Sequence, residues 1–171
     1  METQLNNISI TYSKKINEWN VYNIRRENKK IYFESPYMFV PFGIEKGYGK
    51  DQYILKLQFQ GVKNNIKDIV DFHKLIGNFE NKIMELNSIN RNSFKSQIQT
   101  SKNNYDDLLI FKININKNTL NIVDKHNDIK NIFDIKQKRR IKCFFHSNEL
   151  WSKSNMNVST FSLDKIIIDE E

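Results

Sequence analysis

Apolar and polar residues alternate over short segments of this chain, and this period constrains the fold more than any other feature. Between residues 51 and 60 the alternating positions are Tyr53, Leu55, Leu57 and Phe59, separated by mostly polar residues. Successive side chains of a β-strand point to opposite faces, so a period of two predicts a half-buried strand. Further strands are expected at residues 19–24, 30–40, 108–116, 120–123, 140–146 and 161–168.

A different period occurs at residues 65–87. Apolar side chains and one histidine recur there every three to four residues, at Ile66, Ile69, Val70, His73, Ile76, Phe79, Ile83 and Leu86. This spacing places them on one side of a helix, so the segment predicts a long amphipathic helix. Gly77, inside the segment, weakens that helix by about 1 kcal/mol relative to alanine.

The order of these elements is several strands, one helix and then more strands. It predicts a β-rich α+β fold, and we favour an OB-like antiparallel Greek-key barrel with one long amphipathic helix between its third and fourth strands. A generic α+β sandwich fits the same order. Pro36 and Pro41 restrict residues 30–40 to an edge or bent strand. The chain has two prolines, five glycines and no linker-like stretch, so we expect residues 1–171 to form a single domain.

The net charge is +7, which favours an acidic partner such as nucleic acid or an anionic membrane face. A solvated, lysine-rich surface is an equally good explanation, because lysine, asparagine and isoleucine all have A/T-rich codons. Cys143 is the one cysteine, so no disulfide forms within the chain. The polar residues 1–10 lack a signal-peptide core, and apolar runs such as 166–168 are too short to cross a bilayer. These features predict a soluble cytoplasmic protein.

Enzymatic signatures are weak in this sequence. The three histidines lie far apart, and Cys143 with His146 forms an isolated C-x-x-H without a second pair of zinc ligands. No glycine-rich phosphate loop is present. Asp106 and Asp107 are adjacent carboxylates that suggest a metal-dependent nuclease, although such a pair more often lies at a solvated strand end. We therefore expect no enzyme activity, no metal and no cofactor.

Cationic and aromatic residues interleave in two stretches. Single-strand binders need cations to contact phosphates and aromatic rings on which bases stack. The candidate residues are Trp19, Arg25, Arg26, Lys29, Lys30, Tyr32, Arg139, Arg140, Lys142, Phe144 and Trp151. Among them the arginines and lysines are assigned to phosphates, and the four aromatic residues to base stacking.

The alternation at residues 140–146 supports this assignment. If Ile141, Cys143 and Phe145 face the core, then Lys142, Phe144 and His146 share the exposed face. Simpler explanations stay open: Phe144 could be buried under the helix, the basic stretch 136–140 could be a solvated loop or a targeting patch, and residues 25–30 could form a hairpin turn.

Several segments carry a resemblance to a known family. They are the stretch 35–45 that leads into the strand at 53–59, the basic strand 139–145, Glu149-Leu150-Trp151 and the closing strand. In layout, residues 19–168 resemble the single-stranded DNA-binding proteins of large cytoplasmic DNA viruses and related A/T-rich cytoplasmic elements. Those proteins are similar in design to the OB-fold replication proteins of short-tailed bacteriophages. The resemblance implies a non-catalytic DNA replication or recombination factor that coats displaced strands.

These features favour a largely sequence-independent single-stranded DNA-binding protein. The alternative is a protein-interaction or virion structural domain without nucleic-acid binding, whose cations would be scattered rather than aligned. The acidic end at 169–171 is a candidate contact for replication proteins, and a homo-oligomer is left open as a further form of association.

Overall fold

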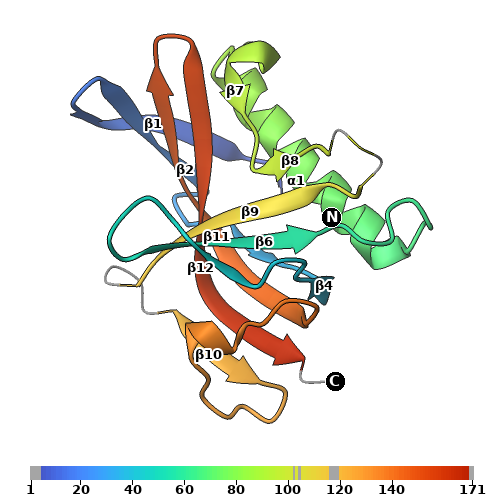
Figure 1. The fold of residues 1–171 in the computed structure, drawn as a ribbon. Helices are drawn as coiled ribbons and strands as arrows, with labels where there is room; N and C mark the ends of the chain where they lie inside the picture. Colours follow the sequence, from blue (N-terminus) through green and yellow to red (C-terminus); the bar gives the residue numbers. More distant parts are fainter. Residues whose placement is uncertain (1–4, 102, 104, 116–119, 170–171) are drawn as a thin grey trace.

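The computed structural model describes residues 5–101, 103, 105–115 and 120–169. Its central element is a long antiparallel hairpin of β11 (Arg140–Lys153) and β12 (Met156–Asp169), which runs through the whole molecule (Figure 1). Ser154 adopts a positive φ of 46° in the tight turn that joins the two strands. All other strands pair directly or indirectly with this hairpin.

The free edge of β11 pairs with three strands in succession. The C-terminal part of β11 pairs with β2 (Trp19–Arg26), its middle with β3 (Tyr32–Glu34), and its beginning with β4 (Met38–Phe39). Strand β2 also pairs with β1 (Ile8–Ile16) across a two-residue turn. One strand thus brings together segments that are far apart in the sequence.

The sheet continues from β4 in one direction and from β12 in the other. Strand β4 pairs with β6 (Gln52–Gln58), which pairs with β5 (Ile44–Lys46) and β9 (Leu108–Asn114); β9 then pairs with β8 (Ile98–Gln99).

The outer edge of β12 pairs in parallel with β7 (Phe94–Lys95) and β10 (Asn121–Asp124). Among the described residues the pairings form an open, mainly antiparallel sheet, so the closed Greek-key barrel stays a prediction.

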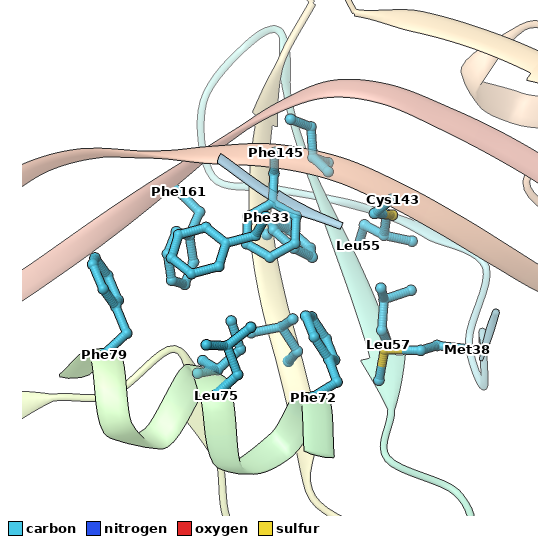
Figure 2. Close-up of a cluster of buried hydrophobic side chains, with 14 of the residues drawn as sticks. Phe33, Met38, Leu55, Leu57, Phe72, Leu75, Phe79, Cys143, Phe145 and Phe161 are labelled. Atoms are coloured by element: carbon cyan, nitrogen blue, oxygen red, sulfur yellow. The ribbon is translucent and has the colours of Figure 1, made fainter. Parts of the chain in front are cut away.

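The helix α1 (Lys67–Leu86) covers the inner face of the sheet, and 3-10 turns lie at Arg91–Ser93 and Ile132–Asp134. The predicted helix at 65–87 is confirmed to within two residues. Its buried side includes Phe72, Leu75 and Phe79, which point toward the strands (Figure 2). Among the described residues, no helix has the length and apolar character needed to span a membrane.

The core is organised around the ring of Phe145 on β11. Its centroid lies 5.0 Å from that of Phe111, 5.1 Å from that of Phe161, 5.3 Å from that of Phe33 and 6.2 Å from that of Phe72. These rings come from the helix and from four strands. Phe145 is 1% exposed. Its packing therefore fixes the distance between the helix and the centre of the sheet.

Two differences from the sequence-based expectations have clear physical causes. Strand β1 was not expected because, apart from Ile8, most of its side chains are polar or exposed. The predicted strand at 30–40 is split into β3 and β4 around Pro36. At the split, the Ser35 N–H donates to the carbonyl of Cys143, and the Cys143 N–H donates to the Ser35 hydroxyl. These two bonds replace the interrupted ladder.

Glu80 connects the helix to the segment between β7 and β8. Its carboxylate accepts hydrogen bonds from the Ser96 hydroxyl at 2.5 Å and the Gln97 N–H at 2.7 Å, and the residue is 1% exposed. Burial raises the pKa of Glu80, while these hydrogen bonds and the charge of Arg91 oppose the rise only in part. A buried carboxylate therefore forms part of the helix attachment.

Replacing Phe145 with alanine should lower the free energy of unfolding by about 3–5 kcal/mol, because it leaves a cavity at the centre of the aromatic cluster. Urea unfolding measures the loss. Phe144→Ala on the same strand is the matched control and should cost about 1 kcal/mol or less, since Phe144 is half-buried on the other face. Equal losses for the two variants would place Phe144 in the core.

Glu80→Gln should flatten the pH dependence of stability. Between its ordinary pKa near 4.5 and its raised folded value, the folded protein retains a proton that the unfolded chain has released. Stability of the wild-type protein therefore falls as pH rises through this window. Urea unfolding at several pH values should show this decline in the wild-type protein and less of it in Glu80→Gln. A steeper decline in the variant would contradict the assignment.

Candidate nucleic-acid interface

The first half of β11 separates its side chains between the core and the outer surface. Ile141, Cys143 and Phe145 are buried, whereas Lys142 and Phe144 are half-buried on the opposite face. Arg140 is exposed on that same outer face. The predicted alternation is therefore confirmed for these residues, and Phe144 lies outside the core rather than under the helix.

His146 is an exception, because it was expected to be exposed and is 6% exposed. Its Nδ1 lies 2.8 Å from a carboxylate oxygen of Asp164, and its Nε2 lies 3.2 Å from the ammonium of Lys30. The Tyr32 ring lies 5.7 Å from the imidazole, at an angle of 58°. His146 still belongs to the outer face, but its neighbours cover it. A carboxylate only accepts hydrogen bonds and an ammonium only donates them, so Nδ1 is the donor toward Asp164 and Nε2 the acceptor toward Lys30.

A β-bulge changes which residues of β11 face outward. The register with β12 shifts between Ser147 and Leu150. Before the shift, even-numbered residues face outward; after it, Leu150 is fully buried and Trp151 faces outward. The bulge therefore places Trp151 on the same surface as Phe144, a result that simple alternation would not predict.

The two tryptophans meet at the end of this surface. Trp19 on β2 and Trp151 on β11 have ring centroids 6.3 Å apart in an edge-to-face arrangement, and the Trp151 indole N–H donates to Glu149 at 3.1 Å. The Lys153 ammonium lies 5.9 Å from the centroid of the Trp19 ring and forms an ion pair with Glu18. The end of the hairpin thus carries two partly exposed indoles beside a cation.

We name this surface the outward strip. It consists of predicted site residues on β2, at the start of β3 and on β11. The register of these strands and the contacts between their residues place them on one face of the sheet. Its members are Trp19, Arg25, Lys30, Tyr32, Arg140, Lys142, Phe144 and Trp151. Strand β11 has 14 residues and so extends over roughly 40 Å.

Three predicted site residues lie off the strip. Arg26 and Lys29 exchange backbone hydrogen bonds of 2.9 Å around Glu27 and Asn28, which have positive φ angles of 49° and 63°. This segment is a hairpin turn, which was the simpler of the two explanations for residues 25–30. Arg139 precedes β11, and its backbone carbonyl accepts a hydrogen bond from the Val40 N–H.

Acidic side chains compensate part of the strip's positive charge. Lys142 forms an ion pair with Glu34, and its ammonium lies 5.7 Å from the centroid of the Phe144 ring. Surface ion pairs of this kind contribute about 0–1 kcal/mol, so a phosphate can compete for the lysine. Lys165 is a cation that the sequence analysis missed. It pairs with Phe144 across the β11–β12 ladder, and only the pairing of the strands brings it to the strip.

Two of the residues considered for enzyme or metal chemistry, Asp107 and Cys143, have structural contacts. Asp107 accepts hydrogen bonds from His73 at 2.9 Å and from the Ser101 N–H at 3.4 Å. Its carboxylate is therefore engaged within the protein and does not act as a pair with that of Asp106. Burial raises the pKa of the Cys143 thiol, which lies in the core. The described part of the chain contains no group of three or more histidine, cysteine or acidic residues that could hold a metal ion.

Comparison with known proteins identifies similar folds but no sequence family. No protein-family model matches the chain, and no curated protein sequence matches it significantly. The fold is similar to that of the single-stranded DNA-binding protein from bacteriophage Enc34 with a C-terminal truncation (TM-score 0.52, 10% identity, 95% of this chain and 97% of that chain). The same phage protein in complex with single-stranded DNA matches with a TM-score of 0.50 and 9% identity, over 95% of this chain and 96% of that chain. At these identities the similarity establishes a shared β-rich fold.

Proposed function

We propose that this chain is a non-catalytic, largely sequence-independent single-stranded DNA-binding protein. The observation that carries the proposal is the outward strip, in which rings and cations alternate along one face of β11 and its neighbours. The shared fold with a phage protein that binds single-stranded DNA supports the same conclusion.

The chemistry of the strip suits a single strand better than a duplex. Stacking on an aromatic ring stabilises each base by roughly 1–3 kcal/mol, and it requires bases that are not already paired. Tyr32, Phe144 and Trp151 supply such rings, while Arg140 and Lys142 lie next to them for the phosphates. A strip of roughly 40 Å fits the site sizes of about 4–16 nucleotides that are typical of such proteins.

The finer parts of the proposal rest on the resemblance and on the sequence. The chain acts as a single domain with an OB-like barrel design, in DNA replication or recombination, in the cytoplasm of a host cell or at a viral replication site. It is related to the proteins of large cytoplasmic DNA viruses and similar elements. Homo-oligomers and replication proteins are further proposed partners. Of the acidic end, Asp169 forms an ion pair with Lys125 at 2.7 Å, whereas residues 170–171 lie outside the described residues.

Titration with oligo-dT should quench the intrinsic tryptophan fluorescence, because both tryptophans of the chain, Trp19 and Trp151, lie on the strip. Four strip cations in contact with phosphates predict a slope of about −3 for the logarithm of affinity against the logarithm of salt concentration. Measurements at two or more salt concentrations give the slope. The absence of binding at low salt would favour the alternative of a protein-interaction or virion structural domain.

Phe144→Ala should weaken binding of a labelled oligo-dT about fivefold to a hundredfold in fluorescence anisotropy, since it removes one stacking ring. Phe133→Ala is the matched control, because Phe133 is 53% exposed and lies away from the strip in a 3-10 turn. The control variant should bind as the wild type does. Equal effects of the two substitutions would argue against the strip as the binding surface.

A further inference from the structure

The outer face of the sheet extends beyond the strip in the direction of β8. Arg140 pairs with Phe39 on β4, Phe39 with Gln58 on β6, Gln58 with Leu108 on β9, and Leu108 with Gln99 on β8. Directly paired residues of antiparallel strands point to the same face. A single row of side chains therefore connects Arg140, at one end of the strip, with Gln58, Leu108 and Gln99.

A pocket of about 450 Å³ lies at the end of this row. Gln58, Leu108 and Gln99 contribute to its lining, and three further lining residues are Phe42, Tyr105 and Asp106. Phe42 is 54% exposed and Tyr105 is 71% exposed, so both rings are available to a ligand. The pocket combines aromatic surface with amide and carboxylate groups.

The walls of the pocket are held by contacts behind them. The carbonyl of Asp107 accepts from the Phe59 N–H at 2.9 Å, and its carboxylate accepts from His73 and Ser101. These bonds anchor the chain next to Asp106. On the other wall, the Lys56 ammonium lies 5.2 Å from the centroid of the Phe42 ring and 2.8 Å from the carboxylate of Glu45. The site is therefore formed before a ligand arrives.

We propose that this pocket receives one base of a DNA strand whose backbone lies on the outward strip, and that it favours bases with an exocyclic amino group. This inference rests on the proposed function. Aromatic rings stack on a base, and glutamine side chains offer both donors and acceptors to its edge. The Asp106 carboxylate is negatively charged, so it repels phosphate, and it only accepts hydrogen bonds. The exocyclic amino group of cytosine, adenine or guanine can donate to it freely, whereas the single N3–H donor of thymine lies between two carbonyl oxygens that the carboxylate repels.

The Asp106→Asn variant tests this specificity. Affinities for twelve-nucleotide oligo-dC and oligo-dT are measured by fluorescence anisotropy for the wild type, for Asp106→Asn and for Glu85→Gln. Glu85 is an exposed residue of α1 that pairs with Lys82, so the Glu85→Gln control removes the same charge away from the pocket. The comparison between variants cancels the intrinsic difference between the two oligonucleotides. Melting temperatures verify that each variant is folded.

The preference for oligo-dC over oligo-dT should fall about threefold to tenfold in Asp106→Asn, because the loss of one hydrogen bond changes an affinity by about this factor. The preference should not change in Glu85→Gln. An unchanged preference in Asp106→Asn, with both oligonucleotides still bound, would overturn the base pocket and leave the proposed function intact. Failure of the wild type to bind either oligonucleotide would overturn both.

Photocrosslinking gives a second, positional test. The wild-type protein is irradiated with oligo-dC that contains 5-iodocytosine, and the crosslinked peptides are identified by mass spectrometry. Crosslinks to Phe42 or Tyr105 are the expected result. Crosslinks confined to peptides of the strip would overturn the pocket as a site for a base.

Discussion

The packing of Phe145 is the interaction on which the rest of the structure depends. Its ring contacts phenylalanines from the helix and from three other strands. Because successive side chains of a β-strand point to opposite faces, the position of Phe145 also determines the face on which the adjacent residues lie. With Phe145 inside, Phe144 and Lys142 must point outward. The core and the candidate interface are thus opposite faces of one strand. The packing of the core therefore fixes where the residues of the interface lie.

Strand β11 would not place Phe144 and Trp151 on one face without an irregularity. Phe144 and Trp151 are seven residues apart, and an odd separation places two side chains on opposite faces of a regular strand. The bulge between Ser147 and Leu150 corrects the phase, so that both rings face outward while Leu150 enters the core. A local defect of the ladder therefore makes a continuous surface from two separate patches.

Much of this arrangement was predictable from local sequence. The amphipathic period gave α1 to within two residues, and the alternation gave β6, β9 and the first half of β11. Strand β1 was missed because, as an exposed edge strand, it has little apolar alternation to detect. His146 was assigned to an exposed position because the sequence contains no sign that Lys30, Tyr32 and Asp164 would cover it.

The sequence by itself determined the kinds of element and which side of each was apolar, because these follow from the period of hydrophobic residues over a few neighbours. Only the tertiary structure decided which elements are adjacent. The row from Arg140 to Gln99 crosses five strands, and the contact of Trp19 with Trp151 joins residues 132 positions apart. Strand order and register depend on packing between distant segments, which no local pattern encodes.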